Sequence, residues 1–226
     1  MFTARQILCL LTFALAIQKI QFETQQREYD IDRCKALITF LATILDRLAD
    51  FNATGCTWNY TGGRGVLHTL ARQALPMIWD FAETNPFNPA AASWISGIRD
   101  VPEGLRDADM PEWAIVERGS ATHLPWSGEW FDAVITDPPY YDNVPYADIS
   151  DFFYIWLKRT IGSLYPEHFA SQGTPKKSEA VADATRYGGS KEKARQAYED
   201  MMAQSFQEAH RTLKPDGQLV SNSRCS

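Results

Sequence analysis

Apolar positions with helical spacing dominate the first third of the chain. Ile7–Gln25 and Ile31–Phe51 each carry hydrophobic side chains every three or four residues, which is the pattern of an amphipathic helix. A third stretch, Val66–Thr84, predicts another helix that Pro76 kinks or divides. The segment Asn85–Pro89 then ends the helical part, because a residue before a proline is displaced from the helical region.

The pattern changes to alternating strands and helices from about residue 112. Trp113–Val116 is a short apolar run of the kind that a buried strand shows, and Phe131–Thr136 is a clearer one. The turn-rich segment Gly119–Trp126 connects them. Ser150 is a suitable N-cap for a helix over Asp151–Ile161. This part of the sequence therefore predicts an α/β fold.

The C-terminal part continues the alternation. Residues 171–190 are polar and punctuated by Gly and Pro, which predicts a long surface loop. A helix then begins at Ser190 or Lys191. Lys214–Gly217 predicts a turn in which the glycine takes a positive φ, and Gln218–Val220 begins a strand. We therefore divide the chain into a helical region, 1–111, and an α/β region, 112–226.

Composition narrows the choice of function. With 226 residues and 45% apolar side chains, the chain has enough material for a sizeable core. Its net charge of -6 argues against a protein that holds nucleic acid by bulk electrostatics, because neutralising phosphates requires a basic surface. Any contact with nucleic acid is therefore expected to be local, or shared with a partner.

The cysteines and the N-terminal segment bear on metal binding and on the cellular location of the protein. The four cysteines form no C-x-x-C pair and have no His at ligand spacing, so we predict no metal site. Ile7–Ile17 has the length of a signal-peptide core, but helical spacing continues past it, and it is too short to span a bilayer. We favour a cytoplasmic protein without a membrane partner, and the signal peptide stays as the alternative.

The tetrad Asp137-Pro138-Pro139-Tyr140 follows the clearest predicted strand. The carboxyl edge of a parallel sheet is where open α/β sheets bind ligands. An exocyclic amine on an aromatic ring is a weak nucleophile because its lone pair is delocalised. The Asp137 carboxylate and the Pro138 carbonyl would accept hydrogen bonds from its two N–H groups and so localise that lone pair. The prolines stiffen the loop, and Tyr140 offers a flat face for a base.

A purely structural interpretation of the tetrad also exists. In it, Asp137 caps the backbone and Tyr140 fills the core. The strand before the tetrad and the helix after it favour methyl transfer to an amine, with all four residues as catalytic candidates. Tyr141, Asn143 and Tyr146 are candidates for binding the substrate base, although packing and turn formation explain them equally well.

A longer segment carries a family resemblance. FDAVITDPPYYDNVPYADISDFFYIWLKR, residues 131–159, resembles the signature of large bacterial and archaeal proteins described as adenine-specific DNA methylases with a DUF1156 domain. Further similar segments make the resemblance cover most of the chain: LTFALA, ALPMIWDFAETNPF and LYPEHFASQGTPKKSEAVAD.

The resemblance implies a partial Rossmann-like class I methyltransferase sheet, preceded by the helical region. It also implies S-adenosylmethionine as the methyl donor and adenine N6 in DNA as the target. In such a fold, Gly119, Ser120 and Ala121 occupy the loop that touches the donor, although Ser120 is equally well explained as a turn residue.

One departure from the family pattern concerns the donor. No F-x-G-x-G loop follows a predicted strand, and Gly62-Gly63-Arg64-Gly65 lies in a connection. We therefore expect the donor loop on a missing upstream segment or on a partner chain, and we expect this chain to be a fragment. The alternatives are a remnant or partner-dependent subunit without activity of its own, and a methyltransferase for guanine N2 in RNA.

Overall fold

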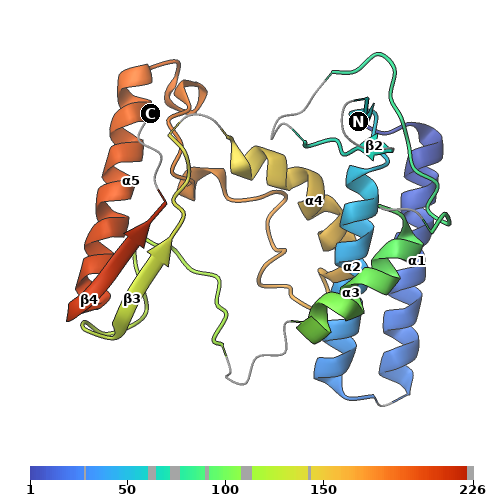
Figure 1. The fold of residues 1–226 in the computed structure, drawn as a ribbon, viewed down its shortest axis with the longest axis horizontal. Helices are drawn as coiled ribbons and strands as arrows, with labels where there is room; N and C mark the ends of the chain where they lie inside the picture. The colour runs from blue at the N-terminus through green and yellow to red at the C-terminus, as the bar shows by residue number, and fades with distance from the viewer. Residues whose placement is uncertain are drawn as a thin grey trace. The chain divides into compact units, whose positions relative to one another are not determined.

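The computed structural model describes residues 1–27, 29–60, 65–71, 77–89, 92–107, 114–141 and 144–222. The fold is mixed α/β, with α-helices, two short 3₁₀ helices and a small parallel sheet among these residues (Figure 1). The chain divides into two compact units. Unit 1 contains Met1–Pro111 and Ala147–Thr174, and unit 2 contains Glu112–Tyr146 and Pro175–Ser226.

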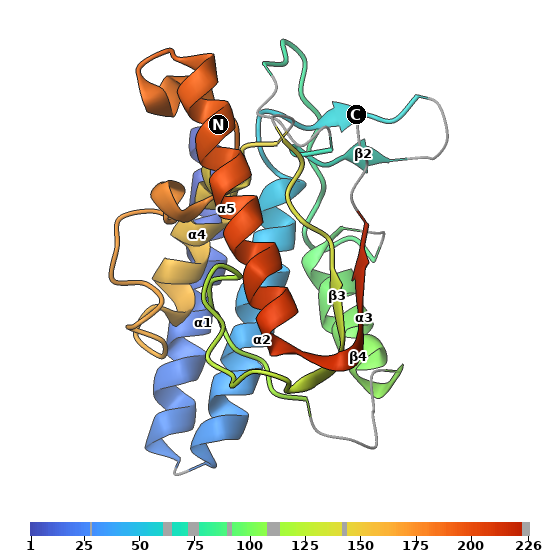
Figure 2. The same cartoon turned by 90° about the vertical axis from the view of Figure 1, so that its left-hand side faces the viewer.

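Two long antiparallel helices form the base of unit 1. The helices α1, Ala4–Gln26, and α2, Ile31–Asp50, lie side by side in Figures 1 and 2. Thr3 begins α1 with a capping box that includes Gln6, and the Asp30 carboxylate caps α2 by accepting from the Arg33 amide. Both helices were predicted from the hydrophobic spacing, and the structure confirms them.

A helix from later in the chain completes the core of unit 1. This helix, α4, runs over Tyr146–Ile161 and contributes its residues from Ala147 onward to unit 1. It begins five residues before the predicted start at Asp151, because Pro145 and the first-turn Asp148 favour an earlier start. The buried side chains of this core come from α1, α2 and α4 and include Leu10, Ile17, Ile38, Leu45, Leu48, Phe152 and Trp156.

The helix α1 is the one described helix that is long and apolar enough to cross a membrane. That property concerns length and composition alone, and core helices and signal sequences share it. Leu10, Ala14 and Ile17 form a buried stripe against the core, whereas Leu8 and Leu15 are exposed.

The connection after α2 differs from the prediction. Val66–Leu67 forms strand β2, which pairs antiparallel with β1, Thr57–Trp58. Residues 68–71 form a turn and residues 77–84 are not helical, so the helix predicted over Val66–Thr84 is wrong throughout its described part. Polar contacts hold the end of this segment in a non-helical conformation. Asn52 at the end of α2 donates to the Thr84 hydroxyl and accepts from the Thr84 amide.

The β1–β2 hairpin is fastened to the end of α2. The Asp50 carboxylate contacts Nδ1 of His68 at 2.9 Å and accepts from the Leu70 amide at 3.2 Å. Cys56 is buried beside Asp50, and this burial raises the pKa of its thiol. The cluster therefore has a structural role. Among the described residues, no three His, Cys, Asp or Glu side chains are placed to hold a metal ion.

A helix that the hydrophobic pattern did not predict packs against α2. This helix, α3, covers Trp94–Asp107 although it contains Pro102 and two glycines. Gly97 allows the close approach, since a Cβ there would lie 2.5 Å from Ile44 Cγ2. Tertiary packing thus outweighs the low helix propensity of this segment.

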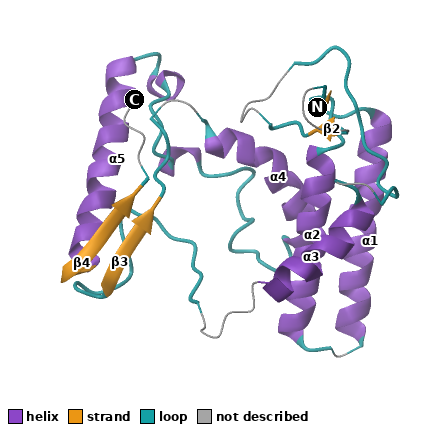
Figure 3. Cartoon of the chain, viewed as in Figure 1, coloured by secondary structure: helices purple, strands orange, loops and turns teal. Residues whose placement is uncertain are grey.

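Unit 2 is a pair of parallel strands with a helix beside it. The strand β3 covers Phe131–Thr136, as predicted, and β4 covers Leu213–Ser221. The two strands point the same way alongside α5, Lys191–Thr212, which Ser190 caps (Figure 3). In the register, Val134 lies opposite Leu219 and Thr136 opposite Ser221.

The predicted turn at Lys214–Gly217 is an irregularity inside β4. Phe131 pairs with Leu213, and Ala133 pairs with Gln218, so Lys214–Gly217 bulge out of the ladder. The positive φ expected at Gly217 is wrong. A glycine is needed for space instead, because a Cβ would lie 3.0 Å from the Lys214 carbonyl oxygen and 3.2 Å from that of Asp132.

The strand predicted at Trp113–Val116 is wrong for its described part. Residues 114–116 form no strand, and Ile115 and Val116 are 79% and 90% exposed. Trp113 lies outside the described residues. Four apolar residues are too few to show the periodicity of a strand, so a strand here would have needed a pairing partner. Within the described residues, β3 pairs with β4 alone.

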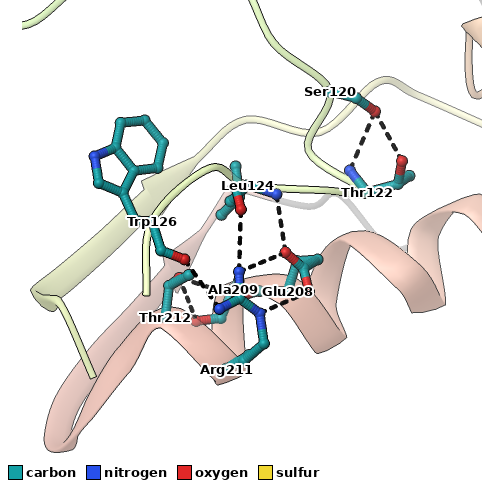
Figure 4. Close-up of polar contacts among 8 residues, drawn as sticks. All are labelled: Ser120, Thr122, Leu124, Trp126, Glu208, Ala209, Arg211 and Thr212. Atoms are coloured by element: carbon teal, nitrogen blue, oxygen red, sulfur yellow. Dashed lines mark hydrogen bonds and ion pairs between the residues drawn. The ribbon is translucent and has the colours of Figure 1, made fainter. Parts of the chain in front are cut away.

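A clamp on α5 holds the segment before β3. The Arg211 guanidinium contacts both carboxylate oxygens of Glu208 at 2.8 Å and donates to the carbonyls of Leu124 and Trp126 (Figure 4). Glu208 also accepts from the Leu124 amide at 2.8 Å. These contacts lower the pKa of Glu208 to about 2, with the hydrogen bond from Arg211 as the main cause.

We predict that Asp46 makes unit 1 less stable as the pH rises. Its Oδ1 atom is buried without a hydrogen-bond partner among the described residues, and burial raises the pKa of the carboxyl to about 8. The folded state then keeps a proton that the unfolded state loses. The free energy of unfolding should therefore fall by roughly 2 to 4 kcal/mol between about pH 5 and about pH 8.

Urea unfolding followed by circular dichroism measures this effect. Asp46→Asn should remove most of the pH dependence, whereas Asp32→Asn, at an exposed position on the same helix, should leave it unchanged. Equal pH dependence in wild type and Asp46→Asn would contradict the prediction.

We predict that Glu208→Ala exposes the Leu124 amide to hydrogen exchange. The amide loses its acceptor and Arg211 loses its bidentate partner, so exchange measured by mass spectrometry should become several-fold faster. Because the folded pKa is depressed, the clamp is intact at neutral pH and weakens in wild type only as the pH falls towards about 2. The control Glu199→Ala, an exposed position on the same helix, should change nothing at Leu124.

Candidate functional site

The tetrad begins at the carboxyl edge of the parallel sheet. Asp137 follows Thr136, the last residue of β3, directly. The Asn222 amide donates to the Thr136 carbonyl at 3.1 Å, so hydrogen bonding with the β4 side continues up to the residue that directly precedes the tetrad. Strand pairing therefore determines where Asp137 leaves the sheet.

Two further hydrogen bonds fasten the loop that contains the tetrad. The Tyr198 hydroxyl, on α5, donates to the Pro139 carbonyl at 3.0 Å. The Ala182 amide donates to the Tyr141 carbonyl at 2.8 Å. The backbone is thus held at Thr136, Pro139 and Tyr141, and all three contacts come from residues distant in sequence.

The two acceptors predicted for the amine are left available. Within the described part of the chain, neither the Asp137 carboxylate nor the Pro138 carbonyl has a hydrogen-bond partner. Asp137 is exposed, while Pro138, Pro139 and Tyr140 are half-buried. The anchored carbonyls therefore lie on both sides of an unused acceptor pair.

The predicted aromatic residues separate into two groups. Tyr146 lies in the electrostatic environment of the tetrad, because burial, then Tyr140, Asp137 and Glu179, raise the pKa of its phenol. Tyr141 instead packs edge-on against Tyr198, with ring centroids 5.1 Å apart.

Tyr146 therefore interacts electrostatically with Asp137 and Tyr140, whereas the ring of Tyr141 packs on Tyr198. Asn143 lies outside the described residues.

The segment that supplies the Ala182 amide is ordered by Arg186. The guanidinium contacts Glu179 at 2.7 Å, donates to the Lys176 carbonyl at 2.9 Å and lies 3.5 Å from Asp183. The Asp183 side chain also caps the 3₁₀ helix Ala184–Tyr187, which ends at Gly188 in a left-handed conformation. The predicted surface loop is therefore a structured segment, and Arg186 is engaged within it.

The residues expected to touch the donor are not joined to the tetrad. Gly119, Ser120 and Ala121 are exposed, and the Ser120 hydroxyl contacts the Thr122 hydroxyl at 2.8 Å and accepts from the Thr122 amide (Figure 4). No hydrogen bond or ring contact among the described residues links these three residues to Asp137–Tyr140. In this conformation Ser120 serves a turn.

Sequence reasoning missed the residues that hold the tetrad. Tyr198 lies on the helix predicted to begin at Ser190 or Lys191, but nothing in the sequence indicates its contact with Pro139. Ala182 contributes through its backbone, for which no side-chain signal exists. Arg186 lies in the predicted polar loop, and its short spacing from Glu179 and Asp183 is the sequence signal that could have indicated the ion pairs.

Comparisons with known proteins give no further assignment. No protein-family model, no curated protein and no solved structure matched the chain. The resemblance to the DUF1156 methylases therefore stays a prediction, and the interpretation of the site depends on its own geometry.

Proposed function

We propose that unit 2 carries the amine-binding part of an S-adenosylmethionine-dependent methyltransferase that acts on an exocyclic amino group. Adenine N6 in DNA is the first candidate substrate. The proposal includes a Rossmann-like sheet, of which β3 and β4 are two parallel strands, and a cytoplasmic location.

One observation carries the proposal. The Asp137 carboxylate and the Pro138 carbonyl, adjacent in the chain at the carboxyl edge of the sheet, are free acceptors, whereas the flanking carbonyls of Thr136 and Pro139 are bound. Pro138 is half-buried, and polar groups of buried residues normally find partners, whereas the exposed Asp137 carboxylate is open to solvent and to a ligand. Two unused acceptors in a stiff, anchored loop fit a ligand with two N–H donors.

The chemistry of an aromatic amine matches this arrangement. When Asp137 and Pro138 accept hydrogen bonds from both N–H groups, the nitrogen is favoured in a tetrahedral geometry, and its lone pair is localised for attack on the methyl group. Tyr140 and Tyr146 lie in the same electrostatic environment as Asp137 and supply flat surfaces for the ring. Anchoring the loop in advance reduces the entropy that must be lost in the transition state.

The donor side is less complete. Within the described residues, no hydrogen bond joins Gly119, Ser120 or Ala121 to the tetrad, and the Ser120 hydroxyl is engaged with Thr122. No described contact of these residues identifies a donor site, and we assign no reaction step to them.

That observation favours a second candidate function. The chain would bind the amine and require a partner chain, or a further segment, to supply the donor site. A subunit of this kind would show no measurable donor binding by itself. Methylation of guanine N2 in RNA is a further substrate candidate, since the acceptor pair recognises the amine rather than the nucleic acid.

We predict that Asp137→Asn lowers methyl transfer by about 10²- to 10³-fold, because one acceptor is replaced in part by a donor. The assay incubates the chain with labelled S-adenosylmethionine and unmethylated plasmid DNA, total RNA or protein. Asp132→Asn is the matched control, since Asp132 lies on the same strand, is exposed and contacts Lys214. It should retain wild-type activity.

The outcomes separate the candidates. Labelling of RNA or protein alone would reject the DNA assignment, and equal activity of Asp137→Asn and wild type would reject the tetrad. Calorimetric titration with S-adenosylmethionine tests the second candidate. Absence of both binding and transfer supports the partner-dependent subunit.

A further inference from the structure

We propose that Tyr198 is a positioning residue of the tetrad, which it holds in one orientation by binding the Pro139 carbonyl. This inference deepens the proposed function and rests on it for the reaction concerned. Tyr198 contacts none of the predicted reacting groups, so its effect passes through the backbone of the tetrad.

The hydrogen bond to Pro139 acts on the acceptor beside it. Each proline fixes φ, and Pro138, which precedes a proline, is confined to extended backbone. In such backbone, successive residues are rotated by about one third of a turn, so neighbouring carbonyls point in different directions. Holding the Pro139 carbonyl on α5 therefore directs the Pro138 carbonyl away from the same contact.

The ring of Tyr198 adds a second contact. It packs edge-on against Tyr141 at 86°, and desolvation followed by the proximity of Tyr141 raises the pKa of its phenol. The hydroxyl therefore keeps its proton at neutral pH and stays a donor to Pro139. Tyr198 thus binds the tetrad through one hydrogen bond and one aromatic contact.

The opposite side of Tyr141 is fixed independently. Its carbonyl accepts from Ala182, whose segment is ordered by Arg186. Because Tyr141 is held on both its ring and its carbonyl, the loop cannot follow a movement of the tetrad freely. Removal of the Tyr198 hydroxyl is therefore expected to act mainly at Pro138 and Pro139.

Tyr198→Phe tests the hydrogen bond while it keeps the ring. We expect a kcat lower by about 3- to 10-fold, the range that a typical net hydrogen bond contributes, with the KM for S-adenosylmethionine unchanged. Tyr187→Phe is the matched control, because the Tyr187 hydroxyl has no hydrogen-bond partner among the described residues. Both variants are compared with wild type at equal folded fraction, measured by circular dichroism.

An NMR experiment tests the hydrogen bond to the Pro139 carbonyl without requiring methyl transfer. The sequence contains two Pro-Tyr pairs, Pro139-Tyr140 and Pro145-Tyr146. Labelling proline carbonyls with ¹³C and tyrosine amides with ¹⁵N gives one correlated NMR signal for each, and Pro145→Ala assigns them. In Tyr198→Phe the Pro139 carbonyl signal should move to higher field, while the Pro145 signal serves as the internal control.

Each result decides the proposal. A Pro139 signal that is the same in Tyr198→Phe and wild type would overturn it, and so would a shifted signal with a kcat equal to that of Tyr187→Phe. If wild type transfers no methyl group to DNA, RNA or protein, methyl transfer by this chain alone is rejected and the partner-dependent subunit remains. The carbonyl signal then still decides whether Tyr198 fixes the tetrad.

Discussion

The parallel pairing of β3 with β4 is the constraint on which the candidate site depends. Two parallel strands need a long crossover, and here the chain between Thr136 and Leu213 contributes Ala147–Thr174 to unit 1 before α5 and β4 complete unit 2. The last paired residue of β3 is followed directly by Asp137. The same crossover brings α5 beside the strands, and with it Tyr198. Pairing, crossover and anchoring of the tetrad are therefore one topological feature.

The sequence predicted elements whose signal is local. Phe131–Thr136 matched β3 to the residue, and α5 begins at Lys191, one of its two predicted starts, because an apolar run and a helix start are signalled within a few positions. Elements that depend on distant contacts were missed or misassigned. The α3 helix forms despite Pro102 since it packs on α2, and Val66–Leu67 pairs with Thr57–Trp58 although its hydrophobic spacing suited a helix.

The residues of the candidate site also separate into those with a local sequence signal and those that depend on distant contacts. The tetrad and its place after a strand could be predicted, because both lie within one short segment. The residues that anchor it come from positions 182 and 198, and hydrogen-bond direction between distant segments has no periodic signature. The Ser120 contact with Thr122 is a local polar interaction, of the kind that a turn-rich composition indicates, and it agrees with the structural explanation of that residue.

Charge further limits what the proposed site can recognise. Asp137 is an exposed carboxylate next to Tyr140, and Glu179 contributes to the same environment while it is paired with Arg186. Arg186 is committed to Glu179, Asp183 and the Lys176 carbonyl, so it is not available for a phosphate. A site of this character repels the nucleic-acid backbone and accepts N–H donors. Within the proposed function, recognition at the tetrad therefore concerns the amino edge of a base, and Arg186 contributes no phosphate contact.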